Sequence, residues 1–137
     1  MTTPRLILLH KQKTSGRVRF LRLPGGMLAF APLPVPASLR EDGYAVAMAA
    51  HPVGVLREAE KKLGLPMGSI EPAAEFQAWV DTPEGDVAVL LASFASIDPP
   101  FEAAAALGGK FIAITEARGL PELELQLLRR VYEYVLG

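Results

Sequence analysis

Cysteine is absent from this sequence of 137 residues. Its absence excludes a disulfide framework, a thiolate nucleophile and a zinc site with cysteine ligands. A long apolar run is also missing near the N-terminus, where only the four aliphatic residues from Leu6 to Leu9 are consecutive before charge returns. That run is too short for a signal peptide or a membrane span. We therefore expect a cytoplasmic protein with no membrane partner.

An excess of charge of one sign is missing as well, because the formal net charge is −1. The chain as a whole therefore has no field that would attract nucleic acid or an anionic membrane. Basic residues do concentrate within residues 11–22, but apart from Phe20 this stretch lacks the interleaved aromatic residues of a nucleic-acid platform. We interpret these cations as the solvated face of a hairpin formed by residues 5–11 and 17–23, and expect no nucleic-acid partner.

Histidine is rare, and neither His10 nor His51 stands in an H-x-E or H-x-x-x-H spacing. A histidine-based metal site is therefore not expected. Ser93 and Ser96 have no G-x-S-x-G context, which leaves a serine nucleophile without support.

Half of the residues are apolar and 21% are charged, as in globular proteins. At this length we expect one domain, spanning residues 1–137. Residues 44–50 fit either a strand or the approach to a helix. Periodicity and turn residues predict strands over residues 5–11, 17–23, 75–80, 86–94 and 110–114, and helices over residues 53–63, 101–107 and 121–136. This order of elements predicts an α/β sandwich.

The helix over residues 53–63 has the most regular pattern in the chain. Apolar residues recur on one face at helical spacing from Val53 to Leu63. Pro52 suits the first turn, where its missing N–H has no intrahelical partner to lose. Gly64 suits a left-handed cap, and Pro66 prevents the helix from continuing.

The segment REAEKKLGL, from Arg57 to Leu65, stands fourteen residues after Gly43. With that glycine it resembles the Nudix box of the Nudix hydrolase superfamily, which reads G, five residues, E, seven residues, REUXEEXGU, where U is aliphatic. The matching positions are Arg57, Glu58, Ala59, Gly64 and Leu65. The resemblance implies a Nudix-like α/β/α sandwich with a mixed sheet, a box helix and a C-terminal helix.

Two other segments extend this resemblance. The motif LPGG at residues 23–26 and the ending FIAITEARGLPELE both look like parts of a Nudix domain. In the family LPGG usually runs directly into the box, whereas here a proline-rich segment intervenes. Residues 31–42 therefore look like an insertion loop. The glycines Gly25 and Gly26 permit a sharp turn that can bring bare backbone close to a ligand.

Three acidic positions of the box depart from the pattern, because the upstream glutamate is Ala49 and the paired glutamates are Lys61 and Lys62. Box carboxylates hold magnesium or manganese against a pyrophosphate, and hard divalent cations require oxygen ligands. We therefore expect no metal-dependent pyrophosphohydrolase activity, no metal or cofactor, and binding of a nucleotide or another phosphate-bearing small molecule. The candidate ligand-binding residues are Gly25, Gly26, Arg57, Lys61 and Lys62.

Two alternatives stay open. The chain could be an active Nudix hydrolase of nucleoside diphosphate derivatives with relocated magnesium or manganese ligands, in which Glu58 and Glu60 are catalytic and Asp98 or Glu102 assists. It could also be a non-enzymatic protein-interaction module whose helix is an ordinary amphipathic one. In that case Glu58 and Lys62 form an i, i+4 pair worth about 0.3 kcal/mol. Nudix proteins are often dimers, so the resemblance also implies a homodimer.

Overall fold

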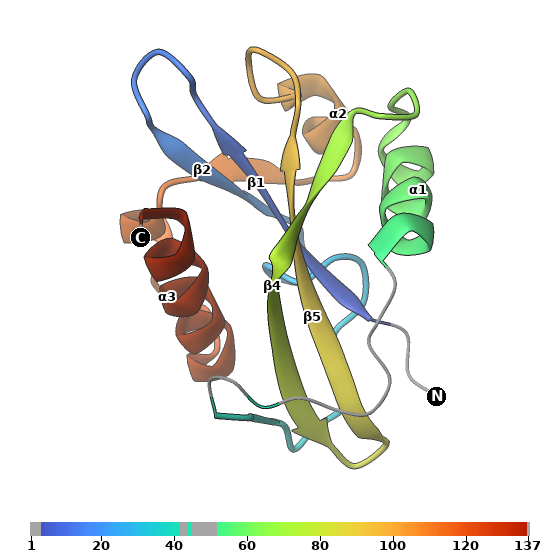
Figure 1. Ribbon diagram of the computed structural model, residues 1–137, viewed down its shortest axis with the longest axis vertical. Helices are drawn as coiled ribbons and strands as arrows, with labels where there is room; N and C mark the ends of the chain where they lie inside the picture. The colour runs from blue at the N-terminus through green and yellow to red at the C-terminus, as the bar shows by residue number, and fades with distance from the viewer. Residues whose placement is uncertain (1–3, 42–43, 45–51, 137) are drawn as a thin grey trace.

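The computed structural model describes residues 4–41, Tyr44 and residues 52–136 (Figure 1). Its strands are β1 (Arg5–Lys11), β2 (Val18–Arg22), β3 (Ser38–Leu39), β4 (Ile70–Thr82), β5 (Gly85–Phe94) and β6 (Lys110–Ile112). Its helices are α1 (Pro52–Leu63), α2 (Phe101–Ala106) and α3 (Glu122–Leu136). The strands form one mixed sheet in the order β3-β4-β5-β1-β2-β6. β1 and β5 pair in parallel, and the other neighbouring pairs are antiparallel.

Helices cover both faces of this sheet. Figure 1 shows α3 on one side of the strands and α1 on the other. Leu127 and Leu128 of α3 belong to one buried apolar cluster, whereas Leu56 and Leu63 of α1 belong to a second. The mixed α/β class predicted from the sequence is confirmed, and the predicted helices and strands occur in the expected order. The short strand β3 was not predicted, because it lies in the segment expected to be an insertion loop.

β1 is the most deeply buried strand of the first hairpin. The four aliphatic residues from Leu6 to Leu9 are all at most 4% exposed. Ile7 and Leu9 enter the cluster on the α3 side, and Leu6 and Leu8 enter the cluster on the α1 side. Because β1 lies between β5 and β2 and has helices on both faces, its apolar residues are consecutive rather than alternating.

The C-terminus of α1 has the predicted left-handed cap. Gly64 has φ +69°, its N–H donates to the carbonyl of Lys61 at 3.1 Å, and the N–H of Leu65 donates to the carbonyl of Glu60 at 2.9 Å. These two hydrogen bonds form a Schellman motif, which satisfies carbonyl groups that the end of a helix leaves without partners.

β4 is longer than the strand predicted over residues 75–80. It begins at Ile70 and continues through Pro72, which lies opposite Ala92 of β5. Proline and the alanines after it carry little strand signal, so sequence patterning places the start too late. The ladder is irregular between Pro72 and Gln77.

The last strand is shorter than predicted. β6 ends at Ile112, and residues 114–116 form a 3-10 turn instead of continuing the strand. The carboxylate of Glu116 accepts a hydrogen bond of 2.8 Å from the N–H of Ala113. This local side-chain bond offers the backbone an alternative to the sheet ladder.

The described part of the proline-rich segment 31–42 is attached to the sheet. At its start, the Arg5 guanidinium donates to the carbonyls of Ala31 and Pro32 at 2.9 and 2.8 Å. Its β3 strand pairs with β4, Leu39 lying opposite Val80. The segment therefore covers an edge of the sheet that would otherwise leave backbone groups unpaired.

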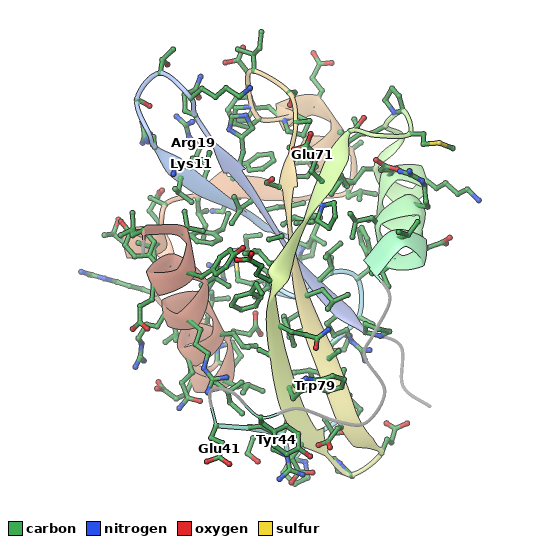
Figure 2. The ribbon with its side chains drawn as sticks, in the orientation of Figure 1. Lys11, Arg19, Glu41, Tyr44, Glu71 and Trp79 are labelled. Atoms are coloured by element: carbon green, nitrogen blue, oxygen red, sulfur yellow. The ribbon has the colours of Figure 1, made fainter. Side chains whose placement is uncertain are left out.

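Tyr44 anchors the chain just beyond this segment. Its hydroxyl donates to Asp86 at 2.8 Å, and the Arg40 guanidinium, which lies 4.8 Å from the centre of the Tyr44 ring, contacts the same carboxylate at 3.1 Å. The hydrogen bond to Asp86 is the main cause of a raised pKa of Tyr44. Figure 2 shows Tyr44 at the end of the molecule where β4 turns into β5. The remaining residues of the 44–50 segment, for which a strand or helix approach is expected, lie outside the described residues.

Within the described part of the chain, no helix has the length and apolar character needed to cross a membrane.

Two glycines, one inside α1 and one at its C-terminal end, should respond oppositely to alanine. At Gly64, φ +69° disfavours any residue with a Cβ although no atom lies within 4 Å of the Cβ position. We expect Gly64→Ala to lower the free energy of unfolding by about 1 kcal/mol. Gly54 lies inside α1 with open space around it, so Gly54→Ala should raise stability by about 0.5–1 kcal/mol. Urea unfolding of both variants tests this, and an equal effect of the two would contradict the assigned cap.

Candidate functional site

Helix α1 divides its residues between the sheet and the solvent. Leu56, Ala59 and Leu63 pack in the core. Glu58, Lys61 and Lys62 are exposed. The exposed surface of the last two turns therefore presents one carboxylate and two ammonium groups, instead of the cluster of carboxylates that a divalent cation requires.

Glu60 faces inward and is only 2% exposed. Its Oε2 accepts hydrogen bonds from the N–H of Gly68 at 2.8 Å and the N–H of Ile70 at 3.0 Å. Its Oε1 accepts one from Nη1 of Arg57 at 2.9 Å. A buried carboxylate is tolerated when donors of this kind satisfy it. The carboxylate thus joins α1 to the loop that follows and to the first residue of β4.

The ionisation of Glu60 reflects two opposing effects. Burial disfavours the charged carboxylate and by itself raises the pKa. The hydrogen bonds from Ile70, Arg57 and Gly68 favour the charged form, and together they bring the pKa below its ordinary value of 4.5. Glu60 is therefore held as a carboxylate whose oxygens are already occupied by protein donors.

Arg57 is one of the donors to the Glu60 carboxylate. Its guanidinium is partly exposed, but Nη1 is bonded to the buried Glu60 one helical turn away. This ion pair has one buried partner, so removing the guanidinium would leave a carboxylate with one donor fewer in a dry environment. Of the three cations predicted to bind a ligand, Arg57 is therefore the one with a structural partner on α1.

Lys61 and Lys62 lie in the last turn of α1. Cations there are favoured by the negative end of the helix dipole. The ammonium of Lys62 lies 4.8 Å from the ring centre of Phe30. Neither lysine forms an ion pair with any residue that the structure describes. Their positive charges are therefore available to an anion from solution.

The LPGG motif forms a tight turn closed by two hydrogen bonds of 2.9 Å, one from each N–H of Leu23 and Gly26 to the carbonyl of the other. Beside it, Oε1 of Glu124 accepts a 2.6 Å bond from the N–H of Met27. A Cβ on Gly26 would lie 2.6 Å from that oxygen. The glycine therefore allows a carboxylate of α3 to approach the turn and to accept a hydrogen bond from the backbone of Met27.

The predicted ligand-binding residues thus occupy two parts of the structure. Gly26 lies against α3 through Glu124, while α1 meets the chain after the turn at Phe30, through Lys62. Around Gly25, a Cβ would meet no atom within 4 Å, so its backbone is open to solvent. The sequence therefore identified exposed groups on both segments. It did not identify the contacts with Glu124 and Phe30, which place the two segments in different parts of the structure.

The acidic residues considered for relocated metal binding are also placed. Asp98 accepts a long 3.5 Å bond from the Gln12 side chain, and Glu102 lies in the first turn of α2. Within the described ranges, no three or more His, Asp or Glu side chains gather closely enough to hold a metal ion. Gly43, Ala49 and His51 lie outside these ranges.

His10 is a buried residue of β1. It is 1% exposed, and its Nε2 lies 2.8 Å from the carbonyl oxygen of Ser96. Since a carbonyl only accepts, Nε2 carries the proton in this contact. His10 lies near the end of the strand predicted over residues 5–11, and its imidazole helps to fix the loop after β5.

Searches of protein-family models and of curated proteins find no match to this chain. The function must therefore be argued from the residues themselves.

Sequence patterning missed the partners that organise the site. Glu60 stands four residues after Leu56 and three before Leu63, which is core spacing. With Arg57 three residues before it, that spacing was a usable sign of a buried ion pair. The contact of Glu124 with Met27 joins residues 97 apart in the chain, and no local pattern indicates it.

Glu60→Gln should destabilise the protein by about 2 kcal/mol near neutral pH, because an amide offers one acceptor oxygen and turns an NH2 group toward donors. The lowered native pKa also predicts a pH dependence. Stability from the carboxylate is present above the unfolded pKa of about 4.5 and is lost as the pH falls through the native pKa.

Urea unfolding between pH 7 and about pH 3 measures both effects. Glu60→Gln should flatten the acid part of the profile. Glu58→Gln, next to it in sequence but exposed, is the matched control and should follow the wild type. Equal behaviour of the two variants would show that the buried carboxylate has no special role.

Proposed function

We propose that this chain is a Nudix-like domain without metal-dependent pyrophosphohydrolase activity, and that it binds a phosphate-bearing small molecule through the last turn of α1. The observation that carries the proposal is the division of charge on this helix. Glu60 is locked inside by three donors, while Lys61 and Lys62 are exposed. The chemistry that remains accessible on the helix favours an anion over a cation.

The order of the elements supports the Nudix-like part of the proposal. A β1–β2 hairpin leads to the LPGG turn, α1 precedes the β4–β5 hairpin, and α3 closes the chain. Helices on both faces of a mixed sheet agree with the α/β/α sandwich that the resemblance implies. These features are shared by many α/β proteins, so the box residues remain the specific support.

The electrostatics support the loss of hydrolysis. Two unit charges about 4 Å apart near a protein surface interact by roughly 4 kcal/mol. Replacing an acidic ligand by lysine turns such an attraction toward a divalent cation into a repulsion. Lys61 and Lys62 stand at two acidic box positions, and the exposed Glu58 alone cannot form a multidentate oxygen site.

The same lysines support anion binding. Each ammonium is a compact charge with three donors, which is a common way to neutralise phosphate. Both stand on a rigid helix rather than on a loop, and Phe30 limits the freedom of Lys62. A phosphate that binds either ammonium group displaces no ion pair with a described residue.

The lost metal site can be tested by restoring the acidic residues. The Lys61→Glu, Lys62→Glu variant places three carboxylates on the exposed part of α1, so magnesium or manganese should raise its melting temperature by mass action. The wild type should show neither this response nor phosphate release from a panel of nucleoside diphosphate derivatives. A Lys13→Glu, Lys110→Glu variant makes the same change of net charge at exposed sites elsewhere. It should also show no metal response and no phosphate release.

Magnesium-dependent turnover by the wild type, abolished by Glu58→Gln, would contradict the proposal and require relocated ligands. If the restored variant binds metal and also hydrolyses a substrate, its product would identify the substrate class that the scaffold still accommodates.

Phosphate binding needs its own experiment. In metal-free buffer of low ionic strength, a nucleoside diphosphate should bind the wild type more tightly than the Lys61→Gln, Lys62→Gln variant by about threefold to tenfold, as expected for two exposed charge contacts. Lys13→Gln with Lys110→Gln is the control for net charge. Isothermal titration calorimetry measures the affinities, and equal weakening by both double variants would reduce the effect to non-specific attraction.

A further inference from the structure

The opposite face of the sheet contains a cavity of about 620 Å³ near the C-terminal end of α3. Leu9 and Leu91 form part of its apolar lining, together with Val135 of α3. Figure 1 shows this end of α3 beside the β1–β2 hairpin, which contributes Leu9 and Lys11. A volume of this size is in the range of small-molecule sites.

The irregular part of β4 borders this cavity and contributes Ala73 and Glu75 to its lining. Pro72 pairs with Ala92 and Gln77 with Leu90, so four residues of β4 oppose the single residue Leu91 of β5. A bulge of this kind bends a strand away from the regular ladder. Phe76, at the end of the bulge, meets Tyr134 of α3 edge to face, with 5.6 Å between ring centroids. The contact between Phe76 and Tyr134 therefore fixes the bulge of β4 against the C-terminal end of α3, beside the cavity.

Three charged side chains surround the apolar lining. Lys11 comes from β1, Glu75 from the bulge and Glu133 from α3, and all three are exposed. None of them forms an ion pair or hydrogen bond with a described residue. By contrast, Arg40 and Arg129 each pair with a nearby carboxylate. Unpaired charges of both signs around an apolar cavity are the complement of an amphipathic zwitterion.

We propose that this cavity binds a small zwitterion with an apolar body, an apolar amino acid or dipeptide, at a site separate from α1. Lys11 receives the carboxylate of the ligand, and Glu75 and Glu133 receive its ammonium group. The apolar side chain lies against Leu9 and Leu91. Tyr134, which is 39% exposed, offers a ring face to the ammonium group at the rim.

Calorimetric titration of the full chain tests this assignment with four probes. Phenylalanine and the dipeptide phenylalanyl-leucine carry both charges. N-acetyl-phenylalanyl-leucine lacks the ammonium group, and phenylalanyl-leucinamide lacks the carboxylate. The wild type should bind at least one zwitterion saturably, and removal of either ligand charge should weaken binding about tenfold, as for a lost charge-assisted hydrogen bond. Whether phenylalanine or the dipeptide binds more tightly sets the size of the ligand.

Variants connect each charge of the ligand to its partner. Lys11→Gln should weaken the zwitterion about tenfold yet leave the affinity for the amide unchanged. Glu75→Gln with Glu133→Gln should remove the preference over the acetylated peptide. All three positions are exposed, so the variants should keep the fold, which circular dichroism checks. Lys13→Gln and Glu84→Gln, exposed and outside the cavity, are the controls.

No saturable binding of either zwitterion to the wild type would overturn the proposal, as would cavity variants that behave like the controls. The Lys61→Gln, Lys62→Gln variant should bind the zwitterion with wild-type affinity. Titration of this variant tests the cavity independently of phosphate binding at α1, because the result at one site does not depend on the result at the other.

Discussion

The buried carboxylate of Glu60 fixes the position of helix α1 on the sheet. After α1 ends at Leu63, the chain reverses through Gly64 and returns so that the amides of Gly68 and Ile70 both donate to this one side chain. Ile70 then begins β4, which pairs with both β3 and β5. An error in this junction would therefore displace the register of a strand that lies between two others, so its free-energy cost would not be confined to the helix.

This constraint separates two roles within one short sequence. Arg57 and Glu60 hold the fold from the inner side of α1, while Glu58, Lys61 and Lys62 face the solvent. Exposed substitutions on a helix usually change stability by less than about 0.5 kcal/mol. Lysine at the C-terminal end is also favoured by the helix dipole. The charge on the exposed surface of this helix can therefore change while the helix keeps its place.

The LPGG turn, like the loop after α1, is held by a helix carboxylate that accepts a backbone hydrogen bond. There Glu124 of α3 accepts from the backbone of Met27, and Gly26 is the residue that lets the carboxylate approach. In both places an acidic side chain of a helix satisfies backbone N–H groups of an irregular segment, which would be costly to leave unpaired when buried. Loop amides are thus partly engaged by the chain itself, whereas Lys61 and Lys62 have no ion pair with any described residue.

Local patterns in the sequence predicted the elements that depend on local physics. The β1–β2 hairpin, the cap at Gly64, the α2 helix and the α3 helix all follow from turn residues and apolar spacing, and the structure confirms them. The start of β4 was missed because proline at position 72 argues against a strand unless β5 is known to lie beside it.

The candidate sites depend much more on contacts between distant residues. Exposure of Lys61 and Lys62 could be predicted from the helical face, but the inward role of Glu60 requires the amides of the following loop, and the role of Glu124 requires α3 to pack near the turn. The cavity at the β4 bulge combines residues from β1, β4, β5 and α3. No single segment carries its signature, because its polar groups are exposed lysine and glutamate residues of ordinary appearance.

The surface at α1 and the cavity at the β4 bulge share one feature, which is that their exposed charges are not paired with described residues. Charges at junctions of the chain are paired, as for Glu60 with Arg57 and for Asp86 with Arg40. Exposed ion pairs contribute about 0–1 kcal/mol, so the fold gains little from pairing charges that remain in water. Lys11 and Lys61 can therefore stay unpaired without loss of stability. Neither position, beside an apolar cavity for Lys11 and on α1 for Lys61, is fixed by an ion pair with a described residue.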